Sequence, residues 1–379
     1  ELYPQDRSQV LKDIERCATL LKYATPDPYF KGLPSPQKLK HNVYHYFDYN
    51  ITKFDIEDMK NYSEIMLSAL EFPNISSLNA GISNSKGLSA LINSNGIKAV
   101  EMSTSIMASL SINLEKDNSI GSGFSFDSST SKEKFDPKKA VEEAHLMASR
   151  MLNKTKIDSG YYELVFSPNL VKKLVARTIA SAANFQGIHQ KRSFLYEMEK
   201  KKVTNDCFTL YNKPDLPFAE DSSPLDDEGV PTFEFPIVKN GVLETYLYNT
   251  YWANRSNKES NGCASRVGVS SPPLIKSKNL VIEPGTAAES EILSTIQNGI
   301  YCENTGDSPN IATGTFSGVL STAYRIENGE ITTGVEEAVL GVKLIELFNK
   351  IELIGNNVKK IGPNFIPSIK FGKIRIGGK

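Results

Sequence analysis

The chain has 379 residues, of which 40% are hydrophobic and 23% charged, and its formal net charge is −1. A chain of this length can form two or three domains, each with its own core. The near-neutral charge and the lack of a long basic block argue against the electrostatic footprint of a nucleic-acid-binding protein. A membrane helix needs about 20 consecutive apolar residues, and no stretch of the sequence approaches that length. We therefore expect neither nucleic acid nor a membrane as a partner.

The four cysteines, Cys17, Cys207, Cys263 and Cys302, lie far apart and form no CxxC pair. This usage is typical of a reducing compartment, and the first residues show no apolar signal-peptide core. We therefore expect a cytoplasmic protein. The sequence does not begin with Met, from which we expect that the native chain extends upstream.

Helical and strand patterns alternate in the first part of the chain. Apolar residues at helical spacing predict a helix over 8–23 with Ser8 as its cap, and the prolines that follow end it. A second helix is predicted over 56–70. Residues 75–126 alternate small polar and apolar side chains between glycine turns, which predicts consecutive antiparallel strands. A proline at the first helical position opens a predicted helix over 138–152.

The polar segment 153–160 is the predicted boundary between two domains, 1–155 and 156–379. Strand patterns dominate beyond it, so the predicted class is α+β with a strand-rich second domain. The predicted elements of that domain are a strand over 162–166, a helix over 169–185, hairpins within 226–249 (around Asn240-Gly241) and 306–330, and a late helix over 335–351.

Several motifs in the second domain point to one family. Asp226, Asp227, Glu228 and Gly229 open the string DDEGVP, and Glu327, Asn328 and Gly329 lie in IENGEI. The strings IGNN at 354–357 and TPDPYFKGLP at 25–34 belong to the same pattern. Over nearly its whole length the chain resembles the TldD/PmbA family of prokaryotic metalloproteases. The resemblance implies an amino-terminal α/β domain that lacks its first segment here, and a carboxyl-terminal domain with a central helix against a curved, mostly antiparallel sheet.

The family resemblance also predicts where a metal site would lie. TldD-type members carry HExxxH on the first helix of the second domain, with a cysteine near the carboxyl terminus as a further ligand. Counted forward from Pro168, that slot falls on Ala176, Arg177 and Ser181, none of which is an ordinary zinc ligand. No Cys or His occurs after residue 356, and a guanidinium at 177 would repel a divalent cation. The chain therefore resembles the PmbA (TldE) type, with no metal ligands, no catalytic residues and no cofactor of its own.

The resemblance implies a role beside a partner. We expect this chain to pair with a TldD-like subunit that carries HExxxH and the zinc, in a peptidase that takes unfolded peptides in extended form. The alternative is a homodimeric peptide-binding or scaffold protein without peptidase activity. A third hypothesis is a different nucleophile, with Cys263 or Ser265 beside His189, but the flanking residues lack the G-x-S-x-G elbow.

The acidic string at 226–229 admits two interpretations. Aspartates before a glycine commonly accept hydrogen bonds from nearby backbone amides, which predicts a structural turn. Carboxylates can also hold Ca²⁺ or Mg²⁺, although the spacing of an EF-hand loop is absent. Because both family subtypes share the motif, with and without metal, we favour the structural turn for it and for 327–329.

Overall fold

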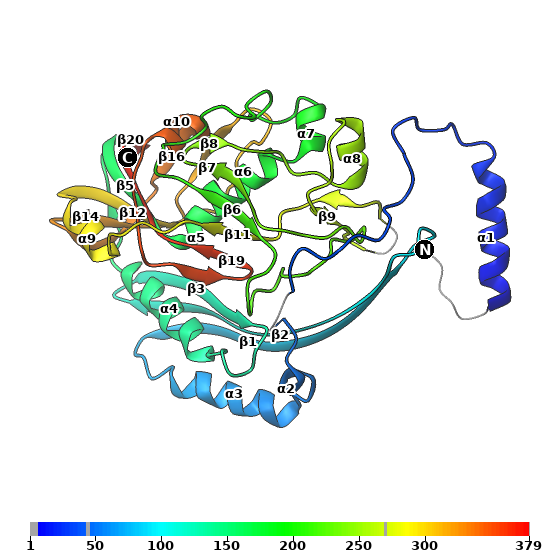
Figure 1. The fold of residues 1–379 in the computed structure, drawn as a ribbon. Coiled ribbons are helices and arrows are strands. Elements are labelled where there is room, and N and C mark those ends of the chain that lie inside the picture. The colour runs from blue at the N-terminus through cyan, green and yellow to red at the C-terminus, as the bar shows by residue number, and fades with distance from the viewer. Residues whose placement is uncertain (1–6, 43–45, 269–270, 379) are drawn as a thin grey trace.

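The structure is a computed structural model that describes residues 7–42, 46–268 and 271–378. It contains an amino-terminal helix, a three-stranded sheet that carries helices, and a larger strand-rich part (Figure 1). The α+β class predicted from the sequence is confirmed. Within the described residues no helix is long and apolar enough to cross a membrane.

Helix α1 (Arg7–Leu21) stands apart from the rest of the molecule (Figure 1). None of its residues is buried, and its apolar side chains include the exposed Leu20 and Leu21. The predicted helix is confirmed, but Ser8 lies inside it rather than at its cap.

The first sheet consists of antiparallel strands β1 (Ile75–Ile92), β2 (Lys98–Lys116) and β3 (Ser119–Ser129). They confirm the strands predicted over 75–126. Strands β1 and β2 form a long hairpin that extends well past the helices of this part (Figure 1). The helices are α2 (Tyr49–Thr52), α3 (Ile56–Ser68) and α4 (Pro137–Arg150), and the last two confirm the helices predicted over 56–70 and 138–152.

Helix α4 packs directly on β3. The side chain of Asp136 caps the helix and Pro137 occupies its first turn. Ala144 and Ala148 on its inner face are fully buried. Glycine on β3 permits the approach, because a Cβ at Gly123 would lie 1.9 Å from the Ala144 carbonyl oxygen.

The strand-rich part contains a nine-stranded sheet, a six-stranded sheet and a two-stranded ribbon. Most neighbouring strands are antiparallel, and the parallel pairs are β12–β5, β15–β4 and β11–β19. The nine-stranded sheet comprises β4 (Thr155–Lys156), β5 (Gly160–Phe166), β12 (Asn298–Asn304), β13 (Thr315–Val319), β14 (Thr322–Glu327), β15 (Glu330–Glu336), β16 (Val339–Lys343), β17 (Ile351–Ile354) and β20 (Ile369–Gly377). The six-stranded sheet comprises β6 (Leu210–Lys213), β7 (Phe235–Lys239), β8 (Val242–Leu243), β11 (Asn279–Ile282), β18 (Lys359–Ile361) and β19 (Asn364–Ile366), and the ribbon comprises β9 (Ala264–Ser265) and β10 (Leu274–Ile275).

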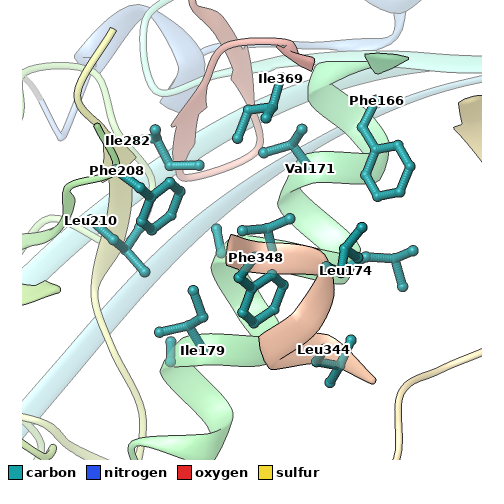
Figure 2. Close-up of a cluster of buried hydrophobic side chains, with 14 of the residues drawn as sticks. Phe166, Val171, Leu174, Ile179, Phe208, Leu210, Ile282, Leu344, Phe348 and Ile369 are labelled. Carbon is teal, nitrogen blue, oxygen red and sulfur yellow. The ribbon is translucent and has the colours of Figure 1, made fainter. Parts of the chain in front are cut away.

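A central helix packs into the core of this part (Figure 2). Its segments are α5 (Pro168–Val171), the π-helical η1 (Lys172–Ala176) and α6 (Arg177–Ala182). Fully buried Val171, Leu174 and Ile179 face Phe208 and Phe348 in one hydrophobic cluster. The shorter helices are α7 (Phe185–His189), α8 (Thr250–Arg255), α9 (Glu289–Ser294) and α10 (Leu344–Asn349).

Three predictions for the strand-rich part are wrong in detail, two of them for helices and one for a hairpin. The helix predicted over 335–351 is the end of strand β15, then strand β16 and the short α10. Leu340 is fully buried while Val339 is exposed, so this short apolar run follows strand spacing, and Gly341 and the β-branched valines disfavour a helix. The central helix also ends at Ala182 rather than at 185, and it contains a π turn.

The hairpin predicted within 226–249 is confirmed by β7 and β8, with Asn240 and Gly241 both at positive φ in the turn. The one predicted within 306–330 is wrong for its first half, because β13 pairs with β16 instead of β14. The hairpin in this region is β14–β15, which turns at Asn328 and Gly329.

Candidate functional site

The central helix has an irregular turn at its middle. Ser167 caps its start. At η1 the backbone N–H of Arg177 donates to the Lys172 carbonyl, and Thr178 Oγ1 donates to the Lys173 carbonyl at 3.0 Å. A π turn closes between residues five apart, so it brings Lys172 and Arg177 to one side of the helix.

A cavity of about 480 Å³ lies against that side of the helix. Lys172, Arg177, Lys276 and Lys278 line it, and Asp221 is the one acidic residue among its described lining residues. Four formal positive charges and one negative charge leave a net charge of +3. We call it the cationic cavity.

Both parts of the molecule contribute apolar walls to the cationic cavity. Phe126 comes from β3 of the first sheet, and Ile275, Leu280 and Ile361 come from β10, β11 and β18. The cavity therefore combines a cationic surface with apolar surface. Ligand sites commonly have this composition, with a few placed polar groups on an apolar lining.

Most of the cations in this cavity lack an acidic partner. Lys276 Nζ lies 3.0 Å from an Asp221 carboxylate oxygen. Within the part of the chain that the structure describes, no ion pair within 4.0 Å is formed by Lys172, Arg177 or Lys278. Lys172 Nζ instead lies 5.6 Å from the centre of the Phe126 ring. The cavity thus holds positive charge that the surrounding protein leaves uncompensated.

The environment of Lys172 disfavours its charged form. Burial, assisted by the positive charges of Arg177 and Lys359 and opposed by Glu220, lowers the pKa of the Lys172 ammonium to about 8. An anion placed in the cavity would reverse this effect.

The residues at the predicted metal slot do not fit zinc. Arg177 and Ser181 lie on the cationic cavity, but Ala176 is fully buried in the hydrophobic cluster, because regular α-helix beyond the π turn places residues five apart on different faces. Guanidinium and ammonium groups are not zinc ligands. Across residues 7–42, 46–268 and 271–378, no group of three or more His, Cys, Asp or Glu side chains could hold a metal ion.

The acidic turn at 226–229 is tied to backbone amides. Asp226 accepts from Glu228 N and Val230 N through Oδ1, both at 2.9 Å, and from Ala264 N through Oδ2 at 3.1 Å. Burial raises the pKa of Asp226 to about 7, although these amide donors lower it. Gly229 has φ +81°, and a Cβ there would lie 2.8 Å from Ile97 at the tip of the β1–β2 hairpin.

The two neighbouring carboxylates extend the same arrangement. Asp227 Oδ2 accepts from Arg266 N at 2.6 Å, and Glu228 Oε2 accepts from Thr250 N at 2.7 Å at the start of α8. The turn thus joins the hairpin tip, the β9 ribbon and α8. This geometry is that of a structural turn.

The turn that contains Glu327, Asn328 and Gly329 lies against the connection between α9 and β12. Asn328 N donates to Gln297 O at 3.0 Å, and Gly329 N donates to Ile296 O at 2.9 Å. None of the three turn residues lines the cationic cavity.

Two further cavities lie in a row with the cationic cavity, and the serine-rich one is in the middle. This serine-rich cavity of about 340 Å³ shares Asp221, Lys276 and Lys278 with the cationic cavity. An apolar cavity of about 510 Å³ is lined by side chains that include Trp252 and Leu274. The serine-rich cavity shares Asp227 with the apolar cavity, and Leu274 of the apolar cavity directly precedes residues 275–278 of the cationic cavity. The three cavities therefore follow one another as one elongated groove between the first sheet and the strand-rich part.

The structure does not bring together the residues of the alternative nucleophile hypothesis, which are Cys263 or Ser265 with His189. Cys263 is fully buried and burial raises the pKa of its thiol, so the reactive thiolate is disfavoured. Ser265 lies in the serine-rich cavity, while the His189 ring contacts Trp252 and Arg255 elsewhere.

Sequence reasoning identified Arg177 but missed Lys172, Lys276 and Lys278. Two of them lie in the string KSK at 276–278, which is far from the helix in the sequence. A short basic string is common at protein surfaces, so only the tertiary fold shows that these lysines face Arg177.

Sequence comparison identifies the family. Residues 49–152 match the PmbA/TldA metallopeptidase central domain, and residues 159–378 match the PmbA/TldA metallopeptidase C-terminal domain. The chain belongs to the PmbA/TldD family. A protein of Methanocaldococcus jannaschii is 28% identical over 295 residues, which are 78% of this chain and 68% of that protein. A metalloprotease PmbA homolog of Haemophilus influenzae is 24% identical and aligns with 98% of this chain and 81% of its own length.

Solved structures show the same fold. TldE from Thermococcus kodakarensis has a TM-score of 0.87 at 22% identity, covering 100% of this chain and 86% of that chain. A Bacteroides thetaiotaomicron protein has a TM-score of 0.88 at 24% identity, covering 100% and 85%. Against several other curated metalloproteases of the family, the alignment spans about half of their length.

Proposed function

We propose that this chain is the non-metal-binding, TldE-type subunit of a cytoplasmic two-chain peptidase that acts on unfolded peptides. One observation carries the proposal. Where TldD-type chains carry HExxxH, this helix presents Arg177 and Ser181 to a cationic cavity. These side chains cannot bind and activate a zinc-bound water.

In this proposal the TldD-like partner supplies the zinc and the hydrolytic reaction. This chain contributes the elongated groove along residues 274–278, in which an extended peptide lies. Backbone pairing with exposed strand edges gives affinity with little sequence selectivity, which suits unfolded substrates.

The test combines purification and activity. The chain is expressed alone and together with a TldD-type chain that carries HExxxH, and zinc is measured by elemental analysis. We expect co-purification, zinc in the complex but not in the isolated chain, and chelator-sensitive cleavage of an unfolded peptide by the complex. A Glu→Gln change in the partner's HExxxH is the matched control and should abolish cleavage. Stoichiometric zinc in the isolated chain, or cleavage by it, would refute the proposal.

The alternative is a homodimeric scaffold without peptidase activity. The exposed apolar residues of the β1–β2 hairpin favour association with some second chain, because Leu88 and Val100 are 72% and 73% exposed. Light scattering during size-exclusion chromatography distinguishes a homodimer of this chain from its complex with a TldD-type chain. A stable homodimer that does not exchange with the TldD-type chain would support the scaffold.

A further inference from the structure

We propose that the cationic cavity binds the terminal carboxylate of an extended peptide whose last residue is apolar. The peptide class rests on the proposed function, whereas the preference for an anion rests on the cavity alone. Binding at this site would orient the peptide in the groove, with its carboxyl end against the central helix.

The charge pattern selects an anion. Lys172, Arg177 and Lys278 face the cavity without a carboxylate partner among the described residues. Arg177 lies on the exposed side of the helix, and a guanidinium can bind a carboxylate through two parallel hydrogen bonds. The hydroxyls of Ser181 and Ser277 also line the cavity and add donors that a carboxylate can accept.

The apolar walls and the volume argue for an organic carboxylate rather than a free inorganic anion. A volume of about 480 Å³ exceeds the needs of a single phosphate or carboxylate group and falls in the range of organic ligand sites. Phe126, Ile275 and Leu280 offer apolar surface beside the cations. An apolar side chain next to a terminal carboxylate fits both features.

The neighbouring serine-rich cavity makes the charge uneven along the groove. Asp221, Lys276 and Lys278 line both cavities. Glu101, Glu220 and Asp227 line the serine-rich cavity but not the cationic one, and Lys172 and Arg177 line the cationic one but not the serine-rich one, so positive charge is in excess at the helix end. A peptide that follows residues 274–278 places its terminal carboxylate among the cations, and the rest of its backbone passes the serine hydroxyls.

The experiment measures binding to this chain alone, without the TldD-type partner, so that failure of the peptidase proposal does not decide it. Calorimetry compares an unstructured heptapeptide ending in Leu as the free acid with the same peptide as its terminal amide. We expect the acid to bind about tenfold more tightly or better, since hydrogen bonds to charged groups contribute effects of this size. A matched acid ending in Ser should bind more weakly than the one ending in Leu.

Variants locate the site. Arg177→Gln with Lys278→Gln should remove the preference for the acid, and both positions reach the cavity surface, so folding is preserved. Lys239→Gln, at the exposed end of β7, removes a positive charge outside the groove and should leave binding intact. Equal affinity for acid and amide, or an acid preference that survives the double change, would overturn the inference. So would inorganic phosphate that binds as tightly as the peptide acid.

Discussion

Replacing Gly123 by alanine tests the packing of α4 on β3. The new Cβ would lie 1.9 Å from the Ala144 carbonyl oxygen and 2.9 Å from the Ala148 nitrogen. An ordinary contact begins at 3.4 Å, so the helix must retreat by about 1.5 Å. The contacted atoms belong to helix backbone, which cannot rotate away as a flexible side chain can.

The free-energy change follows from two effects of that retreat. Overpacking a well-packed core costs about 1–3 kcal/mol, and more where the neighbouring atoms cannot yield. The retreat also loosens the contacts of Val141, Ala144 and Ala148, which are fully buried. We expect Gly123→Ala to lower the free energy of unfolding of this part by about 3–4 kcal/mol.

Urea unfolding followed by far-UV circular dichroism measures the change. Trp252 is the single tryptophan and lies in the strand-rich part, so its fluorescence follows that part separately and should change less. Gly81→Ala on β1 is the matched control, because its Cβ would lie 3.5 Å from Ser109 Oγ in ordinary contact. That control should shift stability by less than about 1 kcal/mol. Equal stability of the two variants would refute the reasoning.

Two further predictions concern the acidic turn and the metal slot. Since burial raises the pKa of Asp226 from its usual 3.8 to about 7, its contribution to stability is present below pH 3.8 and is lost as pH rises through 7. Asp226→Asn cannot titrate, so the stability of wild type relative to this variant should fall from pH 4 to 7 in urea melts. A difference that grows with pH would mean that the amide donors outweigh burial. The triple variant Ala176→His, Arg177→Glu, Ser181→His should not bind zinc tightly when measured by calorimetry. Position 176 faces the core, and the groups that would orient imidazole ligands are missing. Tight binding of one zinc ion per chain would contradict this prediction.

Local patterns predicted the elements whose hydrogen-bonding partners are close in the sequence. The three antiparallel strands of the first sheet follow one another, so alternation and turn residues sufficed. The prediction for residues 339–343 failed because their pairing partners, β13 and β20, are not the strands that precede and follow them in the chain. A short apolar run also suits a helix or a strand equally.

The candidate site shows the same limit. Residue types alone revealed that Arg177 and Ser181 are not zinc ligands. The cavity they face could not be predicted, since it needs the π turn at 172–176 and lysines that β10 and β11 bring from far along the chain. Ala176 shows the limit of the motif itself, because an alignment places this residue in the metal slot but does not reveal that its side chain points into the core.

If an anion binds beside Lys172, its binding must be linked to the protonation of that lysine. The free protein holds the pKa of Lys172 at about 8 through burial, assisted by Arg177 and Lys359 and opposed by Glu220. A bound carboxylate stabilises the ammonium and so raises this pKa, which means that binding takes up a proton above pH 8.

Affinity for the peptide acid should therefore be constant below pH 8 and fall as the pH rises beyond it. Calorimetry at pH 8.5 in two buffers of different ionisation enthalpy should report net proton uptake, and Lys172→Met should abolish it. The neighbour of the lysine ammonium is the uncharged ring of Phe126, and no ion pair of Lys172 within the described residues has to break when the ligand binds. The proton that Lys172 takes up is therefore a response to the charge of the bound carboxylate. Affinity that stays constant up to pH 10, or that rises, would show that the carboxylate does not lie beside Lys172.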